Sequence, residues 1–132
     1  MNPRILILED DATLCRLYKL MLPKMSLEVD TVPSGEQAVE LYIAARNAGA
    51  PYQAVILDLN VQEGIGGLET LAKLKAIDPR VYTIVASGTS QTDIRVEYQN
   101  HGFSDALPKP FRLADIEACM NRMKSRLAQA GS

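Results

Sequence analysis

Residues 4–11 read Arg-Ile-Leu-Ile-Leu-Glu-Asp-Asp, a short β-rich run that ends at once in three acidic residues. Its four apolar residues are consecutive and do not alternate with polar ones, which is typical of a strand covered on both faces in a parallel sheet. Residues 54–58, Ala-Val-Ile-Leu-Asp, repeat this pattern and also end in an acid. Two such strands predict an α/β protein that collects carboxylates at one edge of its sheet.

The rest of the chain alternates between short β-rich runs and longer stretches with an apolar residue at every third or fourth position. Residues 27–32 alternate polar and apolar residues, which favours a half-exposed edge strand. Residues 91–101 fit a strand period as well as a helical one, and we interpret them as a poorly amphipathic helix. The expected strands are 4–8, 27–32, 54–58, 81–86 and 103–107, and the expected helices are 12–22, 35–48, 68–77, 91–101 and 113–127.

Local signals support these boundaries. Asp11 is a candidate N-cap for the first helix, and Ser34 and Gln37 have the spacing of a capping box. The dipeptide Asp78-Pro79 ends the third helix. Five strand–helix units joined by right-handed crossovers predict a doubly wound, five-stranded parallel sheet with helices on both faces, an arrangement of three layers.

Length and composition limit the function classes. A chain of 132 residues has the size of one domain, so we expect a single domain over residues 1–132. The formal net charge of -2 lacks the basic excess of a dedicated nucleic-acid-binding domain. Cys15 and Cys119 have no metal-ligand spacing, no apolar run approaches the roughly 20 residues that span a bilayer, and the N-terminus has no signal-peptide pattern. We expect a cytoplasmic protein without membrane insertion or direct nucleic-acid contact.

Four of the five expected strands deliver polar side chains to the edge where the carboxyl ends of parallel strands meet. These side chains are Glu9, Asp10, Asp58, Ser87 and Lys109. Each alone has an ordinary explanation, because acids and serines commonly cap the helix after a strand, but their coincidence favours a shared site. Three converging carboxylates repel one another unless a cation compensates, and Mg²⁺ takes carboxylates, waters and a phosphate oxygen. The pattern predicts phosphoryl transfer, with Asp58 as nucleophile and Ser87 and Lys109 as donors to the phosphoryl oxygens.

Four segments of the chain, taken in order and at these spacings, resemble the signature regions of response regulator receiver domains, the CheY-like superfamily. The resemblance covers essentially the whole chain. It implies a flavodoxin-like strand order of 2-1-3-4-5 and transfer of phosphate from a histidine kinase or a histidine phosphotransfer protein to Asp58, with Mg²⁺ as cofactor. The four segments are residues 5–11, 54–60, 84–88 and 107–111.

The resemblance also implies roles for individual residues. Ser87 matches the switch hydroxyl, and Lys109 matches the lysine that pairs with the phosphate, next to a Lys109–Pro110 peptide bond that the family usually keeps cis. Strand length leaves Asp11 to begin the first helix. The implied metal site combines the acidic pair, the acceptor and one backbone carbonyl, which are Glu9, Asp10, Asp58 and Asn60.

The chain departs from the family pattern in two places. The loop after the acceptor, which includes residues 63–67, is one residue longer than usual. Ala106 stands where many receivers hold a Tyr or Phe that moves inward on activation. We therefore expect the response to pass through Ser87 and the loop that follows it, without an aromatic switch. Asn60 and Thr89 would flank the phosphate, and we hypothesise that they set how fast water removes it.

At the level of subfamilies, other sequence features are more similar to the C-terminal receivers of hybrid sensor histidine kinases than to the receivers of transcription factors. These features include the Gly66-Gly67 pair, Tyr98 and residues 101–104. Because only residues 128–132 follow the last expected helix, we expect output through a downstream protein partner or a parent hybrid kinase. We interpret His101 as a residue at a helix end, where polar and cationic side chains are favoured, rather than as a phosphohistidine or a metal ligand.

Other protein classes share parts of this pattern. A phosphatase of the haloacid-dehalogenase type also forms an aspartyl-phosphate, but it needs a second acid where this chain has Asn60. A flavin carrier would need a Ser/Thr/Gly-rich loop after the first strand, where this chain has three acids. We therefore predict a phosphoacceptor switch rather than a turnover enzyme, with a phosphorylation-independent binding module of receiver type as the alternative.

Overall fold

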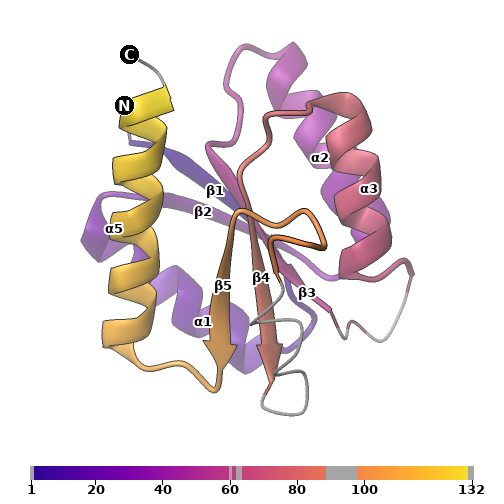
Figure 1. Cartoon of the computed structure of the whole chain (residues 1–132). Coiled ribbons are helices and arrows are strands. Elements are labelled where there is room, and N and C mark those ends of the chain that lie inside the picture. Colours follow the sequence, from indigo (N-terminus) through magenta and orange to yellow (C-terminus); the bar gives the residue numbers. More distant parts are fainter. Residues whose placement is uncertain (1, 60, 62–63, 89–97, 131–132) are drawn as a thin grey trace.

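Five parallel strands form a single sheet in the order β2-β1-β3-β4-β5 (Figure 1). The computed structural model describes residues 2–59, 61, 64–88 and 98–130. The sheet has the flavodoxin-like order that the resemblance implied, and all four strand pairings are parallel. The strands are β1 (Arg4–Leu8), β2 (Glu28–Val32), β3 (Ala54–Asp58), β4 (Thr83–Gly88) and β5 (Asp105–Lys109).

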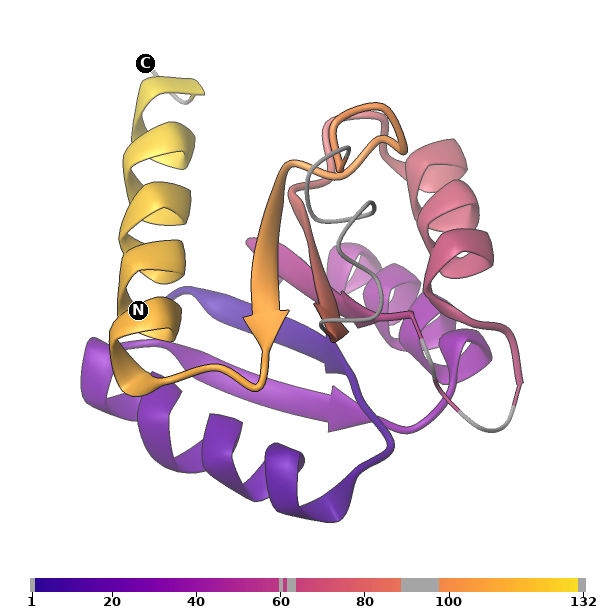
Figure 2. The same ribbon diagram turned by 60° about the horizontal axis from the view of Figure 1, so that its bottom comes forward.

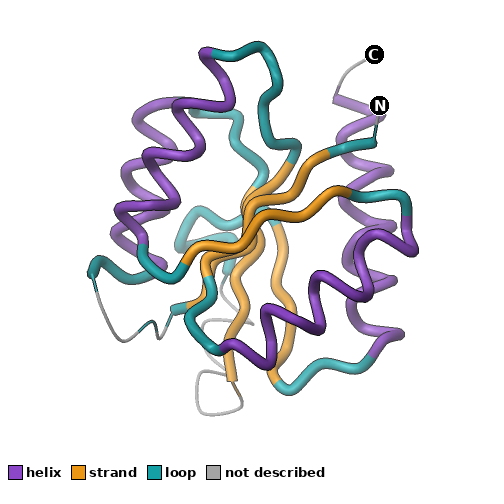
Figure 3. Tube along the Cα trace, turned by 180° about the vertical axis from the view of Figure 1, so that it is seen from behind, coloured by secondary structure: helices purple, strands orange, loops and turns teal. Residues whose placement is uncertain are grey.

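Helices cover both faces of the sheet, so the predicted three layers are confirmed. One face carries α1 and α5, and the other carries α2 and α3 (Figure 1 and, from behind, Figure 3). Within the described ranges, none of the helices is long and apolar enough to cross a membrane. The helices are α1 (Ala12–Met21), α2 (Gly35–Asn47), α3 (Gly67–Ile77) and α5 (Leu113–Ala130), with a short 3₁₀ helix, η1 (Leu22–Met25), after α1.

The consecutive apolar residues of β1 divide between two cores. Ile5 and Ile7 pack with α1 and α5, whereas Leu6 and Leu8 pack with α2 and α3. All four are fully buried. A strand covered on both faces buries the side chains that point to either face, which explains the consecutive apolar residues of β1 and β3. The edge strand β2 remains partly exposed along its length, as its alternating pattern predicted.

Two helices begin where the sequence signals placed them. Asp11 Oδ1 accepts hydrogen bonds from the backbone N–H groups of Thr13 (2.8 Å) and Leu14 (3.1 Å) at the start of α1. Ser34 Oγ accepts a hydrogen bond from the N–H of Gln37 (3.4 Å) at the start of α2. These caps satisfy N–H groups that the first helical turn leaves unpaired.

The predictions for the last two strands were two residues too early. β4 and β5 begin at Thr83 and Asp105, whereas the apolar pattern favoured strands that start at Val81 and Phe103. Val81 and Phe103 are indeed buried, but they precede the first paired residues. An apolar run reports burial rather than backbone pairing, so it placed both strands too early. The shift also puts Ser87 inside β4 rather than after it.

The predicted helix over 91–101 can be compared with the structure only at its end, because residues 89–97 lie outside the described residues. Residues 98–102 form a turn, in which the backbone N–H of His101 donates to the carbonyl of Tyr98 (3.2 Å). His101 is exposed in this turn. The N–H groups of His101 and Gly102 bond three residues back, and the N–H of Phe103 bonds five residues back, to the carbonyl of Tyr98 (3.0 Å). The helix predicted over 91–101 therefore stays a prediction.

Candidate functional site

The carboxyl ends of the strands form the edge that Figure 2 turns toward the viewer. Glu9 and Asp10 directly follow β1, while Asp58 and Lys109 are the last residues of β3 and β5. Ser87 is the next-to-last residue of β4. Because β1, β3, β4 and β5 are consecutive and parallel in the sheet, the structure brings these five predicted site residues to one place.

Three carboxylates form the acidic part of the site. Glu9, Asp10 and Asp58 each offer an oxygen, and these oxygens lie within 4.8 Å of one another. Glu9 and Asp58 expose only 2% and 4% of their surface, while Asp10 is more open to solvent. Like charges this close repel, and burial adds a desolvation cost. An oxygen-only donor set with one open side fits a hard divalent cation such as Mg²⁺.

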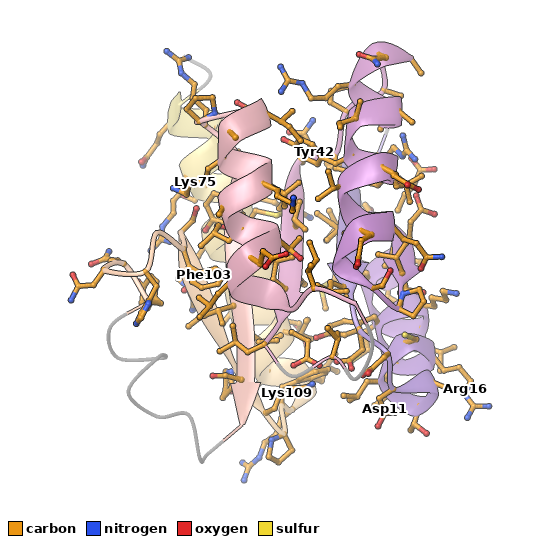
Figure 4. The ribbon with its side chains drawn as sticks, turned by 90° about the vertical axis from the view of Figure 1, so that its right-hand side faces the viewer. Asp11, Arg16, Tyr42, Lys75, Phe103 and Lys109 are labelled. Atoms are coloured by element: carbon orange, nitrogen blue, oxygen red, sulfur yellow. The ribbon has the colours of Figure 1, made fainter. Side chains whose placement is uncertain are left out.

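Lys109 places one positive charge between two of these carboxylates. Its Nζ lies 2.8 Å from Glu9 Oε1 and 3.4 Å from Asp58 Oδ2, and Figure 4 shows it at the same end of the molecule as Asp11. Burial alone would lower the pKa of Lys109, but the hydrogen bond to Glu9 and the charge of Asp58 raise it above its ordinary value. The Lys109–Pro110 peptide bond is cis, as the resemblance implied. A single lysine cannot balance three carboxylates.

Glu9 is held through both of its carboxylate oxygens. Oε1 accepts from Lys109 Nζ (2.8 Å), and Oε2 accepts from the backbone N–H of Asp11 (3.1 Å). Its pKa is raised, chiefly because burial disfavours the charged form, with a smaller contribution from Asp58 and a partial offset by Lys109. Since Asp11 caps α1, Glu9 and Asp10 are the two acids left for the site, as strand length predicted.

Ser87 supplies a buried hydroxyl at the same edge. It is fully buried, and its Oγ has no hydrogen-bond partner among the described residues. In the strand register it lies opposite Pro108, the residue before Lys109. A buried hydroxyl without a partner costs free energy, so such groups call for a specific explanation. Because charged acceptors form the stronger hydrogen bonds, this hydroxyl can donate to an anionic group placed at the sheet edge.

Two other predicted participants, Asn60 and Thr89, lie outside the described residues. The sequence reasoning did not anticipate the role of Gly67. A Cβ at this position would lie 2.8 Å from the carbonyl oxygen of Asp58, so glycine lets the start of α3 pack directly on the backbone of Asp58. The Gly66-Gly67 pair was the available signal, because paired glycines at a helix start often mark a close backbone approach.

Comparison with known proteins agrees with this geometry. Residues 5–121 match the family described as response regulator receiver domain. The chain belongs to this family. It is therefore a receiver domain of the kind found in the response regulators of two-component systems, which are phosphoacceptor switches.

Relatives of this receiver domain include a longer regulator. The cell cycle transcriptional regulator CtrA of Caulobacter vibrioides is 30% identical over 125 residues, which cover 92% of this chain and 52% of CtrA. The chain thus spans about half the length of the curated relatives it matches.

Two solved structures share the fold of this receiver domain. The signal receiver domain of a putative Luxo repressor protein from Vibrio parahaemolyticus has a TM-score of 0.83 at 23% identity, covering 99% of this chain and 96% of that one. The receiver domain of sensor histidine kinase PA1611 from Pseudomonas aeruginosa has a TM-score of 0.78 at 24% identity, covering 93% and 98%. The PA1611 structure holds a magnesium ion coordinated in its active site cleft.

Proposed function

We propose that this receiver domain takes a phosphoryl group from a phosphohistidine onto Asp58 and changes conformation to signal to a partner protein. The donor is the phosphohistidine of a histidine kinase or of a histidine phosphotransfer protein. The observation that carries the proposal is the buried carboxylate of Asp58, which lies beside Lys109 and within reach of two further acids at the end of a parallel sheet.

The transfer requires a nucleophile and positive charge around the phosphoryl oxygens. A carboxylate oxygen of Asp58 attacks the phosphorus, and the phosphorus–nitrogen bond breaks. The imidazole leaves with the electron pair, as a neutral ring when its other nitrogen carries a proton. Lys109 Nζ, 3.4 Å from Asp58, pairs with the transferred group, and the Ser87 hydroxyl donates to one of its oxygens. No proton has to be abstracted, so positioning and electrostatics are sufficient.

The acidic cluster fits a magnesium ion, which neutralises charge on the transferred group when it is bound. The magnesium ion in the cleft of the PA1611 receiver supports this part of the proposal. The backbone carbonyl in the ligand set comes from the family resemblance. The proposed metal site combines three carboxylates with that carbonyl and consists of Glu9, Asp10, Asp58 and Asn60.

The proposed response does not use an aromatic switch. Ala106, on β5, packs its methyl group against the core beneath α2 and α3, and a methyl group has no rotamer to change. We place the response at Ser87 and the loop after it. Output passes to a downstream protein partner or a parent hybrid kinase. The parent's class stays a prediction, because the matches include a transcriptional regulator and a sensor histidine kinase.

We propose that residues 1–132 are one cytoplasmic domain that makes no direct contact with nucleic acid. A cytoplasmic location agrees with the free thiols of Cys15 and Cys119. The domain acts as a phosphoacceptor rather than as a turnover enzyme, since Asn60 stands where a phosphatase of the haloacid-dehalogenase type would hold its second acid.

Intact mass spectrometry after incubation with Mg²⁺ and acetyl phosphate tests the proposal. We expect the wild type and a Glu69→Gln control, changed at an exposed acid on α3, to gain one phosphoryl group, and Asp58→Asn to gain none. EDTA should prevent the gain. Phosphate on neither the wild type nor the control would instead favour a phosphorylation-independent binding module, and phosphate on Asp58→Asn would move the acceptor to another residue.

A further inference from the structure

Near its C-terminal end, the loop that follows Asp58 is hydrogen-bonded to the first turn of α2. The backbone N–H of Ile65 donates to Glu36 Oε1 (2.9 Å), and the Ile65 carbonyl accepts from the N–H of Gly35 (3.3 Å). Both backbone polar groups of Ile65 are therefore paired with α2, and we call these two contacts the Glu36–Ile65 clasp. Glu36 is exposed and lies on a helix that contributes none of the five site residues.

Glycines on both sides make the clasp possible. Gly64, directly before Ile65, has a φ of +75°, and a Cβ at Gly64 would overlap the Glu36 carboxylate. A Cβ at Gly35 would overlap the Ile65 side chain and would lie 2.7 Å from the Ile65 carbonyl oxygen. The loop and the start of α2 therefore approach more closely than residues with side chains would allow.

The same part of the loop also reaches the acceptor. Gly67, two residues after Ile65, lies so close to Asp58 that a Cβ would be 2.8 Å from the Asp58 carbonyl oxygen. Residues 64–67 thus lie between α2 on one side and the backbone of the acceptor on the other. A loop one residue longer than the family pattern has more conformations to restrict, and the clasp restricts them at Ile65.

We propose that Glu36 is a positioning residue for the phosphorylation site, because by holding Ile65 it keeps residues 64–67 packed against the backbone of Asp58, a proposed Mg²⁺ ligand. The inference rests on the proposed function, and it assigns a role to a residue that touches neither the metal nor the phosphate. The Ile65 N–H also holds the pKa of Glu36 below its ordinary value, since it stabilises the charged form. The clasp is therefore formed by a charged carboxylate at neutral pH.

Titration of ¹⁵N-labelled protein with MgCl₂ alone, followed by NMR, measures the predicted effect. Glu36→Ala removes the acceptor for Ile65, and we expect the Kd for Mg²⁺ to rise about three- to tenfold although no ligand is changed. Glu36→Gln keeps an oxygen that accepts from Ile65 and should stay within about twofold of the wild type. Glu40→Ala, one turn further along α2 and also exposed, is the matched control and should leave the Kd unchanged.

Two further measurements separate positioning from a general loss of structure. The Ile65 amide should exchange with solvent faster in Glu36→Ala than in Glu36→Gln, while amides of β1 and β3 should be equally protected in both. Phosphorylation of Glu36→Ala by acetyl phosphate should be slower than wild type at limiting Mg²⁺ and should match it at saturating Mg²⁺. This split is expected because the clasp affects metal binding and not the reacting groups.

Several outcomes would overturn the inference. One is an equal Kd for Glu36→Ala and Glu40→Ala. Another is an equal loss of Mg²⁺ affinity in Glu36→Ala and Glu36→Gln, because the charge of Glu36 rather than its hydrogen bond would then be responsible. A wild-type protein that binds Mg²⁺ but gains no phosphate would refute the proposed function, and the Mg²⁺ titration would still decide the role of Glu36 on its own.

Discussion

Replacing Lys109 with methionine should destabilise the metal-free protein far more than the protein saturated with Mg²⁺. Lys109 lies 2.8 Å from Glu9 and 3.4 Å from Asp58, and these two carboxylates are almost fully buried. Methionine keeps the length of the side chain, so the variant removes the charge without opening a large cavity. In EDTA the carboxylates then lose their compensating cation, whereas bound Mg²⁺ supplies positive charge at the same place.

The expected magnitude follows from distance and burial. At 2.8 Å the Lys109–Glu9 attraction is about 6 kcal/mol for an effective dielectric constant of about 20, before the cost of desolvation is subtracted. Loss of one partner from a fully buried pair costs about 3–5 kcal/mol. Because Lys109 keeps 18% of its side chain exposed, we expect a smaller loss, about 2 kcal/mol in the free energy of unfolding.

Urea unfolding measures the free energy of unfolding of the metal-free protein in EDTA and of the metal-bound protein in saturating Mg²⁺. Lys73→Met, at an exposed position on α3, is the control. We expect Lys109→Met to lose about 2 kcal/mol in EDTA and less than about 1 kcal/mol in Mg²⁺, while the control changes by less than about 0.5 kcal/mol in both. An equal loss in the two conditions would show that Lys109 contributes packing rather than charge, and a gain in EDTA would contradict the electrostatic argument.

Three further predictions concern packing, pH and the switch. Gly35→Ala puts a Cβ onto the Thr70 hydroxyl and should lower stability by about 1–3 kcal/mol. Gly88→Ala, whose Cβ would meet no atom of the described residues within 4 Å, should change stability by less than about 0.5 kcal/mol in the same urea assay. Burial raises the pKa of Glu9 above its ordinary value of 4.5, so the folded metal-free protein keeps a proton at pH values where the unfolded chain has lost it. Its stability should therefore rise, and its Mg²⁺ affinity fall, as the pH drops from neutral towards 4.5. A constant Mg²⁺ affinity over that range would contradict this reasoning. Structures with and without beryllofluoride should show no aromatic side chain moving inward near Ala106, and such a movement would refute the proposed switch.

The fold could be predicted because the central strands of a doubly wound sheet have a distinctive sequence pattern, a run of consecutive apolar residues. Residues such as Ile5 and Leu6 are buried on opposite faces of one strand, and only unbroken apolar runs satisfy both faces. The site could be predicted for a related reason, since parallel strands end at one edge and acids at those ends must converge. Neither argument needs a contact that is distant in sequence to be known in advance.

The parts that the sequence did not reveal depend on contacts between segments far apart in the chain. Pairing of β4 begins at Thr83 because of its register with β3, and no local pattern reports that register. Glu36 resembles any exposed acid in a first helical turn until Ile65 is placed beside it. Gly67 marks a close approach, but only the fold shows that Asp58 is the neighbour.

The Ser87 hydroxyl has no hydrogen-bond partner among the described residues, so stability and the proposed signalling favour different side chains at position 87. In the unphosphorylated state this buried group makes no hydrogen bond with the described residues, so Ser87→Ala should leave thermal stability unchanged or slightly improved. Selection for a robust fold alone would therefore favour alanine at this position. Under the proposed function, Ser87 contributes only while Asp58 carries a phosphoryl group, and a domain optimised for heat resistance without an assay for phosphate would be expected to lose the serine.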